Sequence, residues 1–386
     1  MHKKLSLAIV LTLLVSLLLG NIALAQEPTG DLGVIQRAVD AYLSTTNPVM
    51  TADALYENLN DGDTTNDPFI LSVRSAEQYA LGHIPGAVNI PWRNIAKAES
   101  LAQLPADKQI VVYCYTGHTG QVAQTVLGVL GYNVSNLKFG MMGWSKNDEV
   151  LGLTRFGPDT DQRDYPLETE PNEATETYDF PTVDTGKDEV EDIIAAAADA
   201  WLNSGAAPTL AADALFDLLN DGDESNDPLI LSVRSAEHYA LGHVAGAINI
   251  SWKELGKPEN LAKLPTDKQI VVYCYTGHTG QVATTVLNMM GYNAVNLKFG
   301  MMGWTEDNDV LATGRFDPAT QPDYPFEGSL AAAEEEATPT PEPTPAALPT
   351  TGADPMSLAP VGLVIFGVIS MGIGVAGYAL RRRRSA

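Results

Sequence analysis

One long segment in the middle of the chain occurs twice in tandem, and this repeat limits the possible folds more than any other feature. The segment Val112–His118 recurs as Val272–His278, 160 residues further on. Residues 68–144 and 228–304 align without gaps and are identical at 57 of 77 positions. Solenoid repeats are about 20–50 residues long, so a period of this length indicates a duplicated domain.

Within one copy, segments with helical spacing alternate with short runs rich in β-branched residues. Helices are expected at 52–60, 75–81 and 120–130, and strands at 69–73, 109–113 and 134–139. Strands separated by helices predict βαβ units and therefore an α/β fold, a parallel sheet with helices on both faces. Sites in such folds lie at the carboxyl ends of the strands.

A lone cysteine stands at that position in each copy. Cys114 directly follows the strand 109–113, and a glycine-containing loop then leads into a helix. The loop amides and the helix N-terminus would point at the sulfur and favour a reactive thiolate or a bound anion. The alternative is a buried structural cysteine. Two cysteines in separate units are expected to stay free, because a disulfide needs Cα atoms about 4.4–6.8 Å apart.

Four ordered motifs, each present twice, resemble a rhodanese domain. In the first copy they are Ser72–Tyr79, Gly82–Ala87, the loop that begins at Cys114, and Gly140–Trp144. The resemblance implies a compact α/β domain with a five-stranded parallel sheet. In active members of that family, sulfur is transferred through a cysteine persulfide.

Carried over to this chain, the resemblance implies that Cys114 and Cys274 are the sulfur carriers. The remaining loop residues would bind substrate, and they are Tyr115, Thr116, Gly117, His118 and Thr119 with Tyr275, Thr276, Gly277, His278 and Thr279. A sulfane-sulfur donor and a thiol or cyanide acceptor are the implied partners. No cofactor or metal is expected.

Two departures from the family pattern affect this expectation. Many rhodaneses end the loop with a basic residue that holds thiosulfate, but this chain has Thr119 and Thr279 there. The net charge of −25 further discourages anionic donors, so thiosulfate is expected to be a poor substrate. The only candidate cations in the loops are His118 and His278, which could act at mildly acid pH. The alternative is that both are solvated loop residues. Where the family commonly has an aspartate before Val-Arg, this chain has Ser72.

The two ends of the chain are typical of an exported protein. A basic start, an apolar run and the small residues around Ala25 predict a cleaved secretory signal peptide. Residues 356–380 form an apolar run long enough to span a membrane, and four arginines follow it. Directly before it, Leu348–Gly352 resembles a sortase cell-wall sorting signal, with cleavage between Thr351 and Gly352. The alternative is a plain membrane anchor, and both place the body at the extracellular face.

The organisation expected from these features has six parts. They are a signal peptide (1–25), a rhodanese-like domain (26–166), an acidic linker (167–187), a second rhodanese-like domain (188–328), a stalk rich in Pro, Thr and Glu (329–347), and a segment with the sorting signal, span and basic tail (348–386).

The sequence also bears on functions other than sulfur transfer. The acidic charge opposes binding to nucleic acid. Cysteine phosphatases carry Cys-x5-Arg, and the arginine is absent here. Acidic turns at 60–67 and 220–227 could hold calcium, but the spacing departs from an EF-hand, so a solvated turn is favoured. A binding or sensing module with little turnover is the main alternative to an exported sulfurtransferase.

Overall fold

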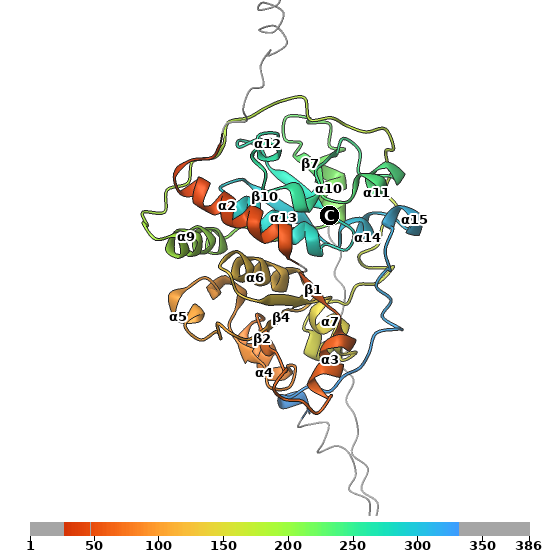
Figure 1. Cartoon of the computed structure of the whole chain (residues 1–386). Helices are drawn as coiled ribbons and strands as arrows, with labels where there is room; N and C mark the ends of the chain where they lie inside the picture. The colour runs from red at the N-terminus through yellow and green to blue at the C-terminus, as the bar shows by residue number, and fades with distance from the viewer. Residues whose placement is uncertain (1–26, 47, 332–386) are drawn as a thin grey trace, which may run out of the picture. The chain divides into compact units, whose positions relative to one another are not determined.

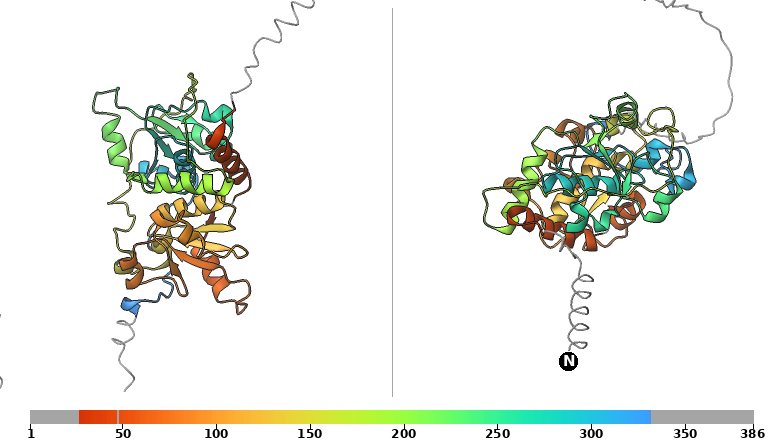
Figure 2. Two further views of the ribbon diagram at one scale, coloured as in Figure 1. Left: turned by 90° about the vertical axis from the view of Figure 1, so that its left-hand side faces the viewer. Right: turned by 90° about the horizontal axis from the view of Figure 1, so that it is seen from above.

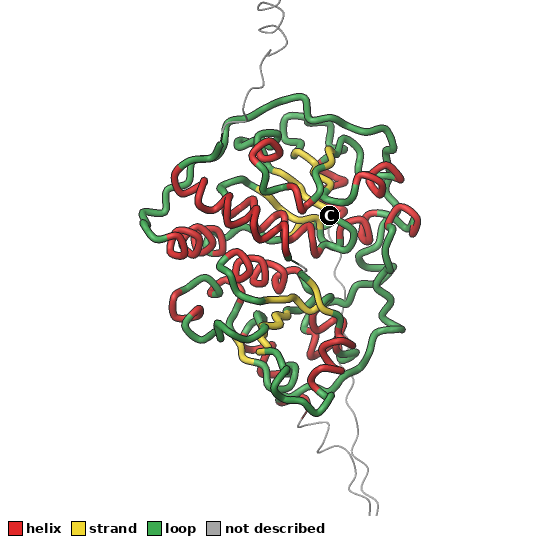
Figure 3. The backbone as a smooth tube through the Cα atoms, viewed as in Figure 1, coloured by secondary structure: helices red, strands yellow, loops and turns green. Residues whose placement is uncertain are grey.

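The computed structural model describes residues 27–46 and 48–331. Each copy of the repeat contains one five-stranded sheet in which all pairings are parallel (Figures 1 and 3). The order is β1-β5-β4-β2-β3 in the first copy and β6-β10-β9-β7-β8 in the second. The expected α/β fold with two parallel sheets is therefore confirmed.

The elements of the first copy are β1 (Val49–Met50), β2 (Phe69–Ser72), β3 (Val88–Asn89), β4 (Ile110–Tyr113) and β5 (Val134–Leu137), with α2 (Gly30–Thr45), α3 (Ala52–Leu59), α4 (Ala76–Leu81), α5 (Ala98–Leu101), α6 (His118–Val129), α7 (Gly140–Trp144), α8 (Asp148–Leu151) and the 3-10 helix η1 (Trp92–Asn94). Those of the second copy are β6 (Thr209–Leu210), β7 (Leu229–Ser232), β8 (Ile248–Asn249), β9 (Ile270–Tyr273) and β10 (Ala294–Leu297), with α9 (Val190–Leu202), α10 (Ala212–Leu218), α11 (Ala236–Leu241), α12 (Pro258–Leu261), α13 (His278–Met289), α14 (Gly300–Trp304), α15 (Asn308–Leu311) and η2 (Trp252–Glu254).

The predicted elements all form, with ends that shift by one or two residues. The helix expected from Gly120 begins at His118, because Gly117 takes the left-handed conformation before it. Polar side chains cap other helices, as Ser75 does when its hydroxyl accepts the N–H of Gln78. The two-residue strands β1 and β3 and the helix α2 were not predicted.

The central strand β4 is buried on both faces, as expected for a β-branched run in a parallel sheet. Ile110 and Val112 belong to one hydrophobic cluster, which includes residues of α6. Val111 and Tyr113 belong to the other, which includes residues of α3 and α7. The strand is thus fixed from both sides, and the residue that follows it is held in place.

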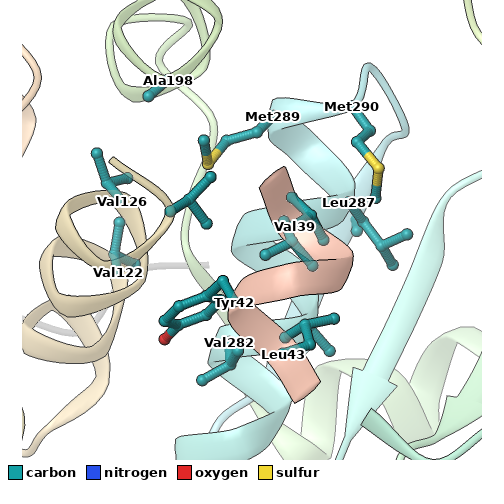
Figure 4. Close-up of a cluster of buried hydrophobic side chains, with 14 of the residues drawn as sticks. Val39, Tyr42, Leu43, Val122, Val126, Ala198, Val282, Leu287, Met289 and Met290 are labelled. Carbon is teal, nitrogen blue, oxygen red and sulfur yellow. The ribbon is translucent and has the colours of Figure 1, made fainter. Parts of the chain in front are cut away.

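The hydrophobic clusters do not stop at the boundary between the copies. Val122 and Val126 of α6 share a cluster with Val282 of α13 and with residues of α2 and α9 (Figure 4). On the other side of the sheets, Phe156 of the first copy contacts Phe299 of the second, with ring centroids 4.8 Å apart. The two copies therefore fold around shared cores.

The first helix of each copy packs on the other copy. In α2, the Gln36 side chain donates to the carbonyl oxygen of Gly256 at 2.7 Å, next to η2. Figure 2 shows α2 beside the second copy. Reciprocally, Arg93 of η1 donates to the carbonyl oxygens of Leu202 and Ala206, at the end of α9. Contacts therefore cross the domain boundaries expected from sequence, and those boundaries stay a prediction.

Several sequence-based expectations concern residues outside the described ranges. They are the signal peptide, most of the stalk, the Thr351–Gly352 cleavage site and the apolar run 356–380. In the ranges that the structure does describe, no helix has both the length and the apolar character needed to cross a bilayer.

Candidate active site

Cys114 and Cys274 lie at the carboxyl ends of the central strands β4 and β9, where the sequence placed them. Both are free thiols, and each residue is only 1% exposed. The N–H of Gly117 points at the Cys114 sulfur at 3.1 Å, and the N–H of Gly277 points at the Cys274 sulfur at 3.2 Å. Each sulfur thus has a main-chain donor that would stabilise negative charge on it.

Glycine is required at the turn of each loop. Gly117 has a φ of +94° and Gly277 a φ of +89°, in the left-handed region that other residues rarely adopt. This conformation aims the glycine N–H back at the sulfur. These two glycines therefore permit the turn in each loop.

A buried asparagine on the neighbouring strand holds each turn. The side-chain amide of Asn136, on β5, donates to the Gly117 carbonyl oxygen at 3.0 Å and to the Gln121 side chain at 3.1 Å. Asn296 makes the equivalent bonds in the second copy. Sequence reasoning missed both asparagines, because one asparagine within a four-residue strand was the only signal.

The segment after β5 supports the cysteine from the other side. The N–H of Met141 donates to the Cys114 carbonyl oxygen at 2.9 Å, and the N–H of Met142 donates to that of Tyr115 at 2.9 Å. A Cβ atom at Gly140 would lie 2.5 Å from the Cys114 carbonyl oxygen. The late glycine motif is therefore required for close packing against the cysteine loop.

The other predicted loop residues make equivalent contacts in both copies, and Nδ1 of His238 adds a contact with the Tyr275 hydroxyl at 2.8 Å in the second. The Tyr115 hydroxyl accepts the N–H of Ser75 at 3.0 Å, and Tyr275 does the same for Ser235 at 3.2 Å. The Thr116 hydroxyl is 2.9 Å from Nδ1 of His118. The corresponding distance from Thr276 to His278 is 3.0 Å.

Thr119 and Thr279 occupy the position where many rhodaneses have a basic residue, each at the start of its helix. The Thr119 hydroxyl is buried and has no hydrogen-bond partner in the part of the chain that the structure describes.

The loop histidines are not solvated, and their surroundings do not favour the cationic form. Both are buried, and burial lowers the pKa of His118 to about 3, with Lys298 as a second cause. Burial and the nearby His118 and Lys138 lower the pKa of His278 well below its usual value. Both imidazoles are therefore neutral at mildly acid pH.

A buried arginine stands next to each loop. Arg74 is fully buried and donates to the carbonyl oxygens of Val150 and Gly82. Its guanidinium carbon lies 5.8 Å from the centroid of the Tyr115 ring. No carboxylate pairs with it in the ranges that the structure describes. The sequence contains an indication of this arrangement, because Arg74 follows strand β2 and so lies at the same sheet edge as Cys114.

Arg234 has the same surroundings in the second copy. Burial lowers the pKa of its guanidinium, while the neighbouring Tyr273, Tyr275 and Cys274 act in the opposite direction. Its guanidinium carbon lies 5.8 Å from the centroid of the Tyr275 ring, so a buried cation stands next to this loop as well.

The acidic turns are closed by their own side chains. The Asp61 carboxylate accepts the N–H of Asp63 at 2.7 Å and the side-chain amide of Asn66 at 2.9 Å. Over the described residues, no group of three or more His, Cys, Asp or Glu is placed to hold a metal ion. The turn thus forms a local hydrogen-bonded loop.

Comparison with known proteins agrees with this geometry. The family model described as the rhodanese-like domain matches residues 51–147 and 212–307, which together make up half of the chain. The protein belongs to the rhodanese-like domain family, as two copies of that domain in tandem.

Similar proteins include sulfurtransferases. A sulfurtransferase from Allochromatium vinosum is 29% identical over 97 residues, which are 25% of this chain and 86% of that protein. The adenylyltransferase and sulfurtransferase UBA4 of Meyerozyma guilliermondii is 39% identical over 87 residues, 20% of each chain. The chain spans a fifth to a half of the length of UBA4 and of two further curated relatives.

Solved structures of related proteins are also similar. The thiosulfate sulfurtransferase of Pseudomonas aeruginosa is 17% identical, with a TM-score of 0.27, over 76% of this chain and 50% of that one. A rhodanese-like domain protein from Staphylococcus aureus is 26% identical, with a TM-score of 0.22, over 24% of this chain and 87% of that one.

Proposed function

We propose that this protein is an exported, surface-anchored sulfurtransferase that carries sulfane sulfur as a persulfide on Cys114, Cys274 or both. The observation that carries the proposal is the twice-repeated placement of a single thiol at the end of a central strand, with a main-chain N–H directed at its sulfur. Membership of the rhodanese-like family and the sulfurtransferases among the relatives support it.

The reaction proceeds in two balanced steps. The cysteine thiolate attacks a sulfane sulfur of the donor, so a new S–S bond forms while the donor's S–S bond breaks and its remnant leaves with the electron pair. A thiolate or cyanide acceptor then attacks the outer sulfur of the persulfide, and the cysteine leaves as a thiolate. No external oxidant or reductant is needed. The Gly117 N–H would stabilise negative charge on the Cys114 sulfur in both steps, and the Gly277 N–H would do the same for Cys274.

A polysulfide, or a persulfide presented by a protein, is the proposed donor. The loops carry no charged side chain that could grip thiosulfate, because Thr119 and Thr279 replace the usual basic residue and the loop histidines are neutral. The buried Arg74 is bonded to main-chain carbonyl oxygens and is not free to grip an anion.

The assay that tests this function measures thiocyanate formed from cyanide with polysulfide or thiosulfate as the donor. We expect turnover with polysulfide, slower turnover with thiosulfate, and none in the Cys114→Ser/Cys274→Ser double variant. The two single variants show whether one or both copies work. Turnover that survives in the double variant would contradict the assignment of the cysteines.

Export and anchoring are tested separately. The sequence of the two ends supports a signal peptide and cleavage after Thr351 by a sortase. The measurement is the mass of the C-terminal peptide from protein released from the cell wall. A peptide that ends at Thr351 supports the sorting proposal, whereas one that continues into residues 356–380 supports a plain membrane anchor.

The low exposure of the two cysteines favours a second candidate function. Each thiol is 1% exposed, so a donor must displace the surrounding loop to reach the sulfur. A rhodanese-like binding or sensing module with little turnover would have such a closed site. Absence of thiocyanate from every donor, with retained folding, would favour this alternative.

A further inference from the structure

The histidine of each cysteine loop crosses into the other copy. The N–H of Phe139 in the first copy donates to Nε2 of His278 at 3.2 Å, and the N–H of Phe299 in the second copy donates to Nε2 of His118 at 3.2 Å. The two imidazole rings are nearly parallel, with centroids 6.1 Å apart. The contact is therefore reciprocal, and each copy supplies one acceptor to the other.

These contacts determine which nitrogen of each neutral ring carries the proton. A main-chain N–H can only donate, so Nε2 of each histidine must be the acceptor. The proton of the neutral ring then lies on Nδ1 and is donated to the threonine of the same loop, Thr116 or Thr276. Each imidazole thus links the loop of its own copy to the main chain of the other.

The main chain of Phe139, which contacts His278, belongs to the segment that supports Cys114. Phe139 has a φ of +63°, which is unusual for a residue with a side chain, and it directly precedes α7. Two residues later, the Met141 N–H donates to the Cys114 carbonyl oxygen at 2.9 Å. A short chain of contacts therefore runs from His278 to Cys114.

The histidine also fits against the turn glycine of the other copy. A Cβ atom at Gly117 would lie 2.5 Å from Nε2 of His278 and 3.0 Å from the N atom of Phe139. Gly117 is the residue whose N–H points at the Cys114 sulfur. His278 therefore closes the Cys114 loop on the side that faces the second copy.

We propose that His278 is a positioning residue for Cys114 and that His118 is a positioning residue for Cys274, so that each copy completes the reactive loop of the other. This inference deepens the proposed sulfurtransferase function and rests on it for its role in turnover. In this arrangement, a change in one loop alters the chemistry of the cysteine in the other.

The test uses the full chain with one cysteine at a time. In the Cys274→Ser background, His278→Ala is expected to slow alkylation of Cys114 by iodoacetamide about fivefold, as loss of a buried hydrogen bond that orders the loop would. Hydrogen exchange at the Phe139 amide should become faster. His278→Gln should restore both, because its side-chain oxygen can accept the same N–H. The shorter side chain of His278→Asn cannot reach the Phe139 N–H, so this variant should behave like His278→Ala. It replaces His278→Ala in the test if the alanine variant unfolds.

His243→Ala in the same background is the matched control, because His243 is a buried histidine of the second copy that lies outside both cysteine loops. It should change the alkylation rate of Cys114 less than twofold. In the Cys114→Ser background, His118→Ala should slow the alkylation of Cys274. Equal effects of His278→Ala and His243→Ala, or an unchanged or faster reaction of Cys114 in His278→Ala, would overturn the proposal. Alkylation needs no sulfur transfer. An effect of His278→Ala on Cys114 in a protein that never takes up sulfur would therefore contradict the proposed function and still support this inference.

Discussion

Trp144 in the first copy donates its indole N–H to the carbonyl oxygen of Pro325, 181 residues further along the chain, at 2.9 Å. Trp304 in the second copy makes the reciprocal contact with Pro166 at 3.3 Å. The tail that follows each copy therefore packs on the other copy, as the first helix also does. The tandem repeat behaves as one reciprocal assembly within the described residues.

This packing predicts that the copies stay together when the linker is cut. A protease site inserted after Gly186, which is exposed, would separate the chain into two fragments. We expect the fragments to co-elute from a size-exclusion column under native conditions and to separate in denaturant. Fragments that separate at micromolar concentration without denaturant would contradict the reciprocal packing.

A second prediction concerns the turn glycine. Gly117→Ala should lower the free energy of unfolding by about 2 kcal/mol or more, because it adds a clash with His278 to the cost of a left-handed alanine. Gly62→Ala is the matched control, since Gly62 has a φ of +86° and nothing within 4 Å of the added Cβ. Its cost should be about 1 kcal/mol. Urea unfolding measures both, and equal costs would show that the clash is absent.

The buried histidines predict a loss of stability in acid. The folded-state pKa of His118 is about 3, below the usual value of 6.5, so the unfolded state binds a proton first as the pH falls. Stability is therefore full above about pH 6.5 and declines toward pH 3. At pH 5 the loss from His118 is about 2 kcal/mol.

The measurement is the urea midpoint at pH 7.5 and at pH 5.0. His118→Gln should lose less stability than the unmodified protein between these values. The explanation fails if His118→Gln loses as much stability in acid as the unmodified protein does.

The buried arginines should matter for both folding and reactivity. Arg234→Leu leaves the carbonyl oxygens of Val310 and Gly242 without their donor, and should lower the free energy of unfolding by about 2–4 kcal/mol. It should also slow sulfur uptake by Cys274, because positive charge near the sulfur is lost. Arg37→Leu, at an exposed site, should change stability by less than about 0.5 kcal/mol.

The fold and the centre of the site could be predicted from sequence because their signals are local. A β-branched strand followed by a cysteine and a glycine loop predicted where Cys114 lies, and the repeat predicted Cys274 in the same surroundings. The turn at Gly117 followed from the conformational freedom of glycine.

What could not be predicted depends on contacts between distant residues. Phe139 and His278 are 139 positions apart, and a periodic pattern does not show which copy a side chain contacts. The same limit applies to α2, whose sequence does not show that it packs on the second copy. The loop sequence around Thr119 gives no indication of Arg74, which follows the neighbouring strand β2.

Intact mass spectrometry after incubation with polysulfide tests the capture of sulfur most directly. Each functional cysteine should gain the mass of one sulfur atom, which cyanide should then remove, and Cys114→Ser or Cys274→Ser should abolish the gain at that site. A folded protein whose mass stays unchanged at both cysteines would contradict the conclusion that these loops carry sulfur.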